Sequence, residues 1–417
     1  MVKSSSLFLK DSGGTYESIP VQTNHHKTKK IPASIMKHSL LSTVVLAATS
    51  FLTTSAFAQS TWEWVDDYQL VPGKVAGVTG VAAVDNGVVF SSGGAEDASG
   101  VRYGFVRRSL DAGLSWLNVL DIPGIAQLAA VTIGPSGRVH VAGPSLANGW
   151  VTAVSDNGGS SWAVVNAWAG AGSPLAVVED VAGRAFVGGY IIDTNKRWHF
   201  FIRRSLDGGA TWTTVQDLVS PSGNSSVWAM AATPAGVFAA GRYGATTWIV
   251  RRSTDGGQTW NTVDTYYSGS SGNFPYGMTA DANGNFFVTG VAYISPGKNK
   301  PSVAHWITRR STNGGQTWTV VDDFVLGSSP TGRAITVDAY GSVFASGSAV
   351  VNGVNRWITR VSLNGGDSWT TTDDVALTGS GYPRGAAADA AGNVFIGGQA
   401  LGTDGVTRGL VRGLAAQ

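Results

Sequence analysis

The sequence predicts an all-β protein that closes into a ring of seven four-stranded blades, a β-propeller. Two observations predict this fold: an eight-residue segment recurs six times at intervals of about fifty residues, and a strand-like segment recurs seven times with the same period. Repeats of this length are typical of propellers and solenoids, in which each unit buries its apolar face against its neighbours. A third observation, a last repeat divided between the two chain ends, favours a closed ring.

The eight-residue segment reads Ser, any residue, Asp or Asn, any residue, Gly, any residue, Ser or Thr, Trp. Its copies begin at Ser109, Ser155, Ser205, Ser253, Ser311 and Ser362. An Asp or Asn followed by Gly favours a tight turn, because the short side chain bonds to its own backbone and Gly adopts positive φ. The Trp is expected to bury a large apolar area between blades. These carboxylates are therefore interpreted as structural and not catalytic.

Each repeat divides into four short segments rich in β-branched and aromatic residues and bounded by Gly, Asn, Ser or Pro, which predicts strands. The second segment occurs seven times, starting at Val88, Val139, Ala185, Val237, Phe286, Val343 and Val394. The chain end RGLVRG, residues 408–413, aligns with third segments, and TWEWVDDY, residues 61–68, aligns with fourth segments. We therefore expect the N-terminal strand to complete the last blade as its outermost member, which removes the open end of the array.

Residues 1–58 are expected to lie outside this fold. From Met36 the chain has a basic start, an apolar core and the small-residue sequence Ala56-Phe57-Ala58, the pattern of a signal peptide cleaved after Ala58. Residues 1–35 are either a long n-region or an upstream extension with Met36 as the true start; the second is favoured because n-regions are short. The sequence thus predicts export to the periplasm or medium, no membrane span after cleavage, and one propeller domain over residues 59–417.

The charge of the mature chain argues against a polyanionic partner. Of 29 Lys and Arg and 27 Asp and Glu, six lysines and two acidic residues lie in residues 1–58. That leaves 23 basic and 25 acidic residues, a net charge of −2, so nucleic-acid binding is not expected. The chain has no cysteine, so packing and not disulfides must stabilise it.

The Ser-x-Asp-x-Gly-x-Thr-Trp repeat resembles the Asp-box of bacterial sialidases, which also occurs in sortilin-type receptors, xyloglucan-cleaving hydrolases and a photosystem assembly factor. The resemblance implies a propeller fold with the box turns facing away from the active site, and it does not imply an activity. Sialidases also carry three arginines, a Tyr–Glu pair, an Asp and a Phe/Tyr-Arg-Ile-Pro segment. This chain has only Tyr382-Pro383-Arg384, in a different order, and three mature glutamates, Glu63, Glu96 and Glu179. With seven blades instead of six, sialidase chemistry is disfavoured.

A ligand site is predicted on the face that carries the loops leading into the innermost strands. Eight positions before the turn glycines of the seven innermost strands stand Thr79, Ala129, Leu175, Trp228, Tyr276, Arg333 and Arg384. The last four place two aromatic residues beside two arginines in consecutive blades, and nearby Tyr266, Tyr267, Phe274 and Tyr382 add aromatic surface. Such a platform and cationic clamp suits an acidic or hydroxylated carbohydrate or a peptide carboxylate. The alternative, that these side chains plug the channel, remains open.

Catalytic residues are less well indicated. Glu96 and Asp97 in the first blade and Asp404 in the adjoining last blade are candidates for a two-carboxylate glycosidase site, although loop acids are more often only solvated. The favoured function is therefore non-catalytic binding of a carbohydrate or protein, with a glycoside hydrolase as the alternative and a purely structural role third. His140, His199 and His305 occupy unmatched positions, so neither a metal nor a cofactor is predicted.

Three further repeated residue types are interpreted as structural. An arginine recurs in the third strand of six blades and is expected to pair with the box or with a neighbouring strand. Glycines that are not part of a phosphate-binding loop are interpreted as turn residues. The arginines are Arg107, Arg203, Arg251, Arg309, Arg360 and Arg412. Asp281, Asp338 and Asp389 precede turn glycines and are interpreted as turn formers.

Overall fold

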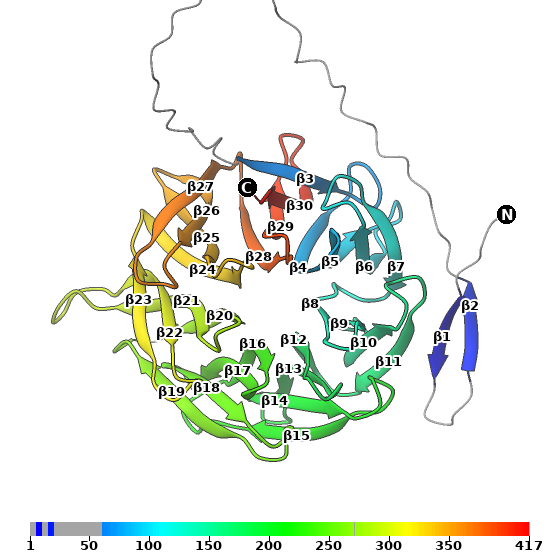
Figure 1. The fold of residues 1–417 in the computed structure, drawn as a ribbon, viewed down its shortest axis with the longest axis horizontal. Coiled ribbons are helices and arrows are strands. Elements are labelled where there is room, and N and C mark those ends of the chain that lie inside the picture. Colours follow the sequence, from blue (N-terminus) through cyan, green and yellow to red (C-terminus); the bar gives the residue numbers. More distant parts are fainter. Residues whose placement is uncertain (1–5, 11–15, 21–60, 271, 417) are drawn as a thin grey trace, which may run out of the picture.

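The computed structural model describes residues 61–270 and 272–416, and the backbone of residues 6–10 and 16–20. The described part contains strands and no helix, and hence no helix that could cross a membrane. Seven blades, each of four antiparallel strands, stand around a common centre (Figure 1). This arrangement is a seven-bladed β-propeller, as the sequence predicts.

The strands of the first four blades begin close to the predicted positions. Blade 1 contains β4 (Ala76–Val84), β5 (Val88–Glu96), β6 (Arg102–Ser109) and β7 (Leu117–Pro123). Blade 2 contains β8 (Ala130–Ile133), β9 (Val139–Pro144), β10 (Trp150–Ser155) and β11 (Ala163–Trp168). Blade 3 contains β12 (Gly172–Glu179), β13 (Ala185–Ile192), β14 (Trp198–Ser205) and β15 (Thr213–Leu218). Blade 4 contains β16 (Ser226–Thr233), β17 (Gly236–Tyr243), β18 (Thr247–Ser253) and β19 (Asn261–Tyr267).

The last three blades include the one that closes the ring. Blade 5 contains β20 (Phe274–Ala280), β21 (Phe286–Ile294), β22 (Val303–Ser311) and β23 (Thr319–Phe324). Blade 6 contains β24 (Ser328–Val337), β25 (Val343–Val351), β26 (Val354–Ser362) and β27 (Thr370–Ala376). Blade 7 contains β28 (Gly381–Ala388), β29 (Val394–Leu401), β30 (Thr407–Leu414) and, outermost, β3 (Trp62–Tyr68).

Ring closure takes place within blade 7. Strand β3 pairs antiparallel with β30, with Trp62 opposite Leu414 and Tyr68 opposite Gly409. The first and last strands of the ring therefore share one sheet, which confirms the predicted split blade. Outside the ring, β1 (Ser6–Lys10) and β2 (Tyr16–Pro20) form a hairpin whose β1 runs parallel to β11. The predicted signal peptide, residues 36–58, lies outside the described residues.

The repeated eight-residue segment forms the turn between the third and fourth strands. In blade 4 the Ser253 hydroxyl donates to Asp255 Oδ1 at 2.8 Å and accepts from Gly257 N at 2.8 Å. Asp255 Oδ1 accepts from Thr259 N at 2.9 Å, and Oδ2 accepts from the Thr259 hydroxyl at 2.6 Å. The side chains thus satisfy the turn backbone, which confirms their structural interpretation. Asp281, Asp338 and Asp389 cap their turns in the same manner.

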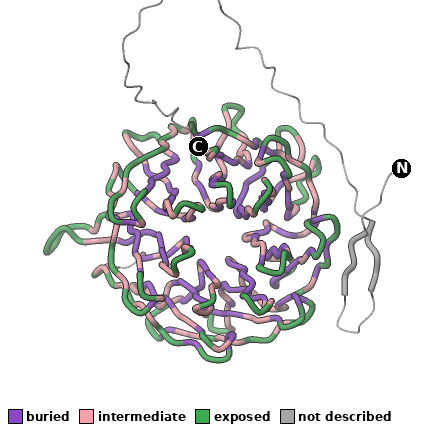
Figure 2. The backbone as a smooth tube through the Cα atoms, viewed as in Figure 1, coloured by how far each residue is buried: buried purple, intermediate pink, exposed green. Residues whose placement is uncertain are grey.

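The indoles of these segments lie at blade junctions as expected. Trp260 packs edge-on against Phe186 of the preceding blade with ring centroids 6.4 Å apart, and Trp62 packs against Phe344 in the same way. A second set of indoles, in the third strands and outside the eight-residue repeat, is completely buried. Its members are Trp150, Trp248, Trp306 and Trp357. Figure 2 shows the buried backbone concentrated in the inner strands of each blade.

One glycine in each second strand has a packing role, which corrects its interpretation as a turn residue. A Cβ on Gly290 would lie 2.0 Å from the Phe274 carbonyl oxygen, and one on Gly241 would lie 2.1 Å from that of Ser226. Real Cβ atoms do not approach a backbone oxygen so closely, so only glycine allows the first strand to lie this close to the second. The seven glycines are Gly93, Gly143, Gly189, Gly241, Gly290, Gly347 and Gly398.

Candidate ligand-binding site on the loop face

The predicted site residues occupy one structural position. The pairing register between the first and second strands shifts at Trp228, Tyr276, Arg333 and Arg384, and likewise at Thr79 and Leu175. Each of these residues is therefore the extra residue of a β-bulge, a device that re-aims a side chain out of the regular pattern. Because the bulges lie near the start of the innermost strands, the side chains stand close to the loop face. The alignment made from turn glycines thus marks one structural position in six blades, whereas Ala129 of blade 2 precedes β8, which pairs without a shift.

The four residues from blades 4 to 7 form a continuous run with two aromatic neighbours. Trp228 meets Tyr276 edge-on at 5.0 Å between ring centroids, and Phe274 lies nearly parallel to Tyr276 at 5.6 Å. The Arg333 guanidinium carbon stands 4.9 Å from the centroid of Tyr276 and 4.5 Å from that of Tyr382. We call these residues, together with Arg384, the stacked half-ring. Tyr266 and Tyr267, also expected nearby, instead belong to the outermost strand β19.

Arg384 ends the stacked half-ring at blade 7. Its guanidinium carbon lies 5.0 Å from the Tyr382 centroid, and its Nη2 donates to the Tyr382 hydroxyl at 2.8 Å. Gln399 Nε2 donates weakly to the same hydroxyl, at 3.4 Å. All four predicted binding residues are half-buried. The side chains therefore pack on one another and still reach solvent.

Arg333 carries a charge that nothing nearby neutralises. Among the described residues it makes no hydrogen bond and no ion pair, and its guanidinium stacks on the rings of Tyr276 and Tyr382. Burial lowers the pKa of Arg333 and raises that of Tyr276, which leaves the phenol neutral. The buried Nε atoms of Arg333 and Arg384 and the Nε1 of Trp228 have no acceptor within the described part of the chain. Other buried arginine Nε atoms, such as those of Arg203 and Arg310, also lack an acceptor, so Arg333 is distinguished by its missing ion pair and not by its Nε.

The third-strand arginines are partnered, in contrast. Arg309, Arg360 and Arg412 each bond to an Asp in the fourth strand of the preceding blade, and Arg107 does the same with Asp66. Arg203 and Arg251 donate to the carbonyl groups of Trp212 and Trp260 in their own box turns. The prediction of a structural role for this set is confirmed.

A pocket of about 300 Å³ lies between blades 7 and 1 on the loop face. Its lining includes one predicted binding residue, Arg384, and one predicted catalytic residue, Glu96. Glu96 Oε1 accepts from Arg102 Nε at 3.2 Å. The remaining lining comes from small and polar residues: Val75, Ala76, Gly77, Gly94, Ala95, Arg102, Ala126, Gln127, Gln399 and Thr407.

The other two carboxylate candidates are used by their own turns. Asp97 Oδ1 accepts from Ser99 N, the Ser99 hydroxyl and Val101 N, and hydrogen bonding by Ser99 lowers the pKa of Asp97. Asp404 accepts from Arg408 Nη2 at 2.7 Å, and this bond lowers its pKa. Neither lines the pocket. Glu96 is therefore the single carboxylate in it.

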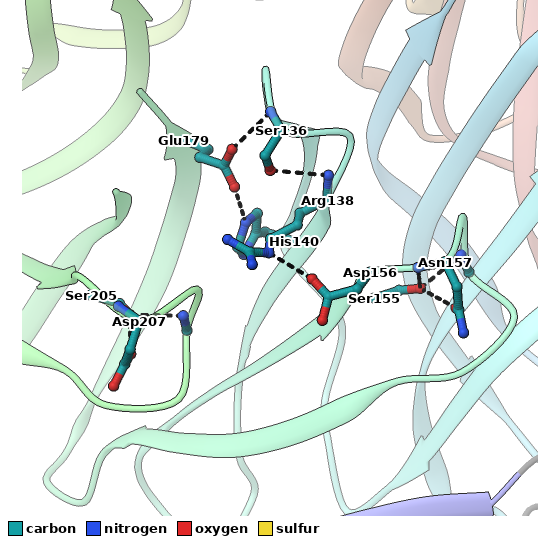
Figure 3. Close-up of polar contacts among 11 residues, drawn as sticks. Ser136, Arg138, His140, Ser155, Asp156, Asn157, Glu179, Ser205 and Asp207 are labelled. Carbon is teal, nitrogen blue, oxygen red and sulfur yellow. Dashed lines mark hydrogen bonds and ion pairs between the residues drawn. The ribbon is translucent and has the colours of Figure 1, made fainter. Parts of the chain in front are cut away.

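His140 forms a buried contact on the opposite face of the ring. Its Nε2 lies 2.7 Å from Glu179 Oε2, across the junction between blades 2 and 3, and both side chains are almost inaccessible (Figure 3). Burial lowers the pKa of His140. Burial also raises the pKa of Glu179, but hydrogen bonds from Ser136 and His140 outweigh it and the net shift is downward. A neutral His140 imidazole that donates to the Glu179 carboxylate agrees with the downward pKa shifts of both groups. The pair is therefore a structural contact.

The other two histidines pair with aspartates in their own blades. His199 Nδ1 bonds to Asp217 and His305 Nδ1 bonds to Asp323, each at 2.6 Å. Throughout residues 61–416, apart from residue 271, no group of three or more His, Cys, Asp or Glu side chains is placed to hold a metal ion.

Comparison with known proteins identifies the fold alone. No family model and no characterised protein sequence matches this chain. The structure is similar to the RRP9 WD40 repeats, with a TM-score of 0.54 and 10% identity over 86% of this chain and 98% of that one. It is also similar to the Pseudomonas aeruginosa periplasmic gluconolactonase PpgL, with a TM-score of 0.51 and 14% identity over 82% and 100%. A Hadza microbial sialidase, Hz136, matches with a TM-score of 0.45 and 16% identity over 65% and 63%.

Part of the pocket lining has no counterpart in the sequence repeat. Arg102, Gln127 and Gln399 line the pocket but carry no repeated motif. A signal was present in the repeat: Gly77 stands two positions before its bulge residue, where blades 5 and 7 carry Phe274 and Tyr382. A missing side chain at one repeat position marks a place where space can open.

Proposed function

We propose that this protein is an exported propeller that binds an anionic ligand, a carbohydrate or a peptide or protein carboxylate, through its loop face. The stacked half-ring supplies the binding surface. Trp228 and Tyr276 offer aromatic faces on which a sugar ring or apolar group can stack, and Arg333 and Arg384 offer charge-assisted hydrogen bonds. No chemical step is required of these residues.

The observation that carries this proposal is the uncompensated guanidinium of Arg333. A half-buried cation surrounded by rings loses hydration without gaining a carboxylate partner. A structural plug would be more stable with an apolar or paired residue at this bulge, as in blade 3, where Leu175 stands. A bound anion restores the missing hydrogen bonds.

Export and family membership belong to the same proposal. The leader with its Ala-Phe-Ala sequence supports secretion or a periplasmic location, and the eight-residue repeat supports membership of the Asp-box propellers. N-terminal sequencing of the protein recovered from periplasm or medium tests the first point. A mature N-terminus at Gln59 is expected, and retention of the full leader on cytosolic protein would contradict it.

Binding is tested on arrays of neutral glycans, acidic glycans and carboxylate-ended peptides. Arg333→Ala and Trp228→Ala should weaken binding of an acidic ligand at least about tenfold, because each removes a contact worth ~1.5 kcal/mol or more. Leu175→Ala changes the equivalent bulge in blade 3 and serves as the matched control. If all three variants bind as the parent does and only melting temperature changes, the half-ring is a plug.

A glycoside hydrolase is the alternative function, and the presence of Glu96 in the pocket is the observation that favours it. A glycosidase normally needs two carboxylates that flank the scissile bond, and Asp97 and Asp404 are held in turns away from the lining. Release of product from aryl glycosides and polysaccharides, lost in Glu96→Gln or Asp404→Asn, would establish the hydrolase instead.

A further inference from the structure

Two glycines of blade 1, Gly77 and Gly94, line the pocket between blades 7 and 1. The position two before each bulge carries Phe274 in blade 5 and Tyr382 in blade 7, but Gly77 in blade 1. The position after each second-strand glycine carries Arg242 in blade 4 and Gln399 in blade 7, but Gly94 in blade 1. Two adjacent strands thus lack side chains at the same level, and the Ala126 backbone and the Gln399 side chain approach closely there and form part of the pocket lining.

The lining of this space is polar and of mixed charge. Two guanidinium groups, Arg102 and Arg384, face one carboxylate, Glu96, so the charges sum to +1. The amides of Gln127 and Gln399 and the hydroxyl of Thr407 each supply both donors and acceptors. The lining therefore offers a ligand more hydrogen-bond donors than acceptors, and one of the acceptors is the Glu96 carboxylate.

The pocket is joined to the stacked half-ring through one phenol. The Tyr382 hydroxyl accepts from Arg384 Nη2 at 2.8 Å and from Gln399 Nε2 at 3.4 Å, and both of these side chains line the pocket. The Tyr382 ring is at the same time the face on which Arg333 stacks. A ligand that lies along the half-ring can therefore place its end in the pocket.

We propose that this pocket is an end subsite for a polyhydroxylated carboxylate, the uronic acid residue of an acidic glycan; this inference rests on the proposed function. The carboxylate binds the Arg384 guanidinium and the excess positive charge of the lining, while ring hydroxyls donate to Glu96 and bond with the two glutamines. The volume of about 300 Å³ lies at the lower end of the range for ligand pockets, which suits one sugar unit.

A peptide C-terminus fits this lining less well. It supplies a carboxylate for Arg384 but few donors for Glu96, and its last side chain would leave the two glutamine amides without partners. An unpaired polar group inside a site weakens binding. Several hydroxyl groups on one ring satisfy these residues together.

The repeat itself indicates how to fill the pocket without altering the fold. Blade 7 carries Tyr382 at the position of Gly77, and the backbone of Gly77 is not in the left-handed region. A Cβ on Gly77 would meet Gln399 Oε1 at 2.5 Å, and this is the end of a flexible side chain. Gly77→Tyr should therefore occupy the pocket, and Gln399→Ala removes one polar contact with little steric effect.

Isothermal titration with free D-glucuronate tests the inference, with D-glucose and acetate as comparison ligands. We expect glucuronate to bind the parent at least about tenfold more tightly than either comparison ligand, because each lacks one of the two recognised groups. Gly77→Tyr should abolish this binding, and Gln399→Ala should weaken it. If glucose binds as well as glucuronate, or if both variants bind glucuronate as the parent does, the inference is wrong.

A second measurement separates the subsite from the half-ring. Trp228 does not line the pocket, so Trp228→Ala should bind free glucuronate as the parent does and bind an acidic oligosaccharide more weakly. Unchanged oligosaccharide binding in this variant would contradict the proposed function while the subsite stands. Loss of oligosaccharide binding in Trp228→Ala, with no glucuronate binding by the parent, would contradict the subsite alone.

Discussion

Arg309 binds Asp264 across the junction between blades 4 and 5 through two hydrogen bonds, Nε to Oδ2 at 3.0 Å and Nη2 to Oδ1 at 2.8 Å. Both side chains are largely buried. Arg309 also donates to the carbonyl of Trp318 in its own box turn. One guanidinium thus fixes a turn and a blade junction together.

The same Arg–Asp pair occurs at four blade junctions, and an apolar pair replaces it at a fifth. Where the fourth strand carries Asp four residues after its tryptophan, the next blade carries the third-strand arginine. Between blades 1 and 2, Leu120 and Ala153 occupy the two positions and pack in one apolar cluster. At the two remaining junctions Arg203 and Arg251 stand without an Asp at this position of the preceding blade and bond to backbone carbonyl groups instead. Each Asp at this position is therefore matched by an arginine, as a buried carboxylate requires.

Breaking this pair on one side should be costly. Asp264→Leu leaves the Arg309 guanidinium buried without a counter-ion and should lower the free energy of unfolding by about 3–5 kcal/mol. The double variant Asp264→Leu/Arg309→Ala copies the junction between blades 1 and 2 and should recover most of that loss. Urea unfolding of both single variants and the double variant measures the coupling. Additive losses would contradict the pairwise interpretation.

The second-strand glycines should not tolerate even a methyl group. Gly290→Ala places a Cβ against the Phe274 carbonyl, so we expect a loss of about 1–3 kcal/mol from the resulting backbone shift. Gly409→Ala is the matched control, since its Cβ would come no closer than 3.3 Å to another atom, the Val78 Cγ2 methyl or the Val78 backbone nitrogen. Thermal unfolding should separate the two variants clearly, and equal melting temperatures would refute the close-approach argument.

The box turns should depend on an acceptor and not on a charge. Asp255→Ala removes the acceptor for Gln258 N, Thr259 N and the Thr259 hydroxyl and should cost about 1–2 kcal/mol. Asp255→Asn keeps the Oδ1 acceptor, as Asn313 does in blade 5, and should cost less. Chemical denaturation compares the two variants. An equal loss in both would show that charge is what matters.

Asp121 should make stability depend on pH near neutrality. Burial raises its pKa to about 7, although a hydrogen bond from Asn118 and the charge of Arg107 oppose this shift. Since the folded pKa exceeds the unfolded value of about 3.9, the folded state binds the proton more tightly. Its contribution to stability is therefore complete below pH about 4 and is lost as the pH rises to about 7.

The melting temperature of Asp121→Asn, relative to the parent, should therefore increase between pH 4 and pH 8, as expected from the raised pKa of about 7. Asp374→Asn changes the equivalent residue of blade 6, which is more exposed and pairs with Arg356, and serves as the control. A pH-independent difference for Asp121→Asn would contradict the raised pKa.

The sequence by itself determined the all-β class, the seven blades, the closure by β3 and the equivalence of Trp228, Tyr276, Arg333 and Arg384. It could do so because turns and strands depend on residues close together in the chain, and seven copies repeat the same local hydrogen bonds. The tertiary structure decided which residues meet across blades. It left Arg333 without a counter-ion, placed Asp97 and Asp404 in their own turns, and opened a pocket beside Gly77. These outcomes depend on side chains from different repeats at one junction, which no single repeat encodes.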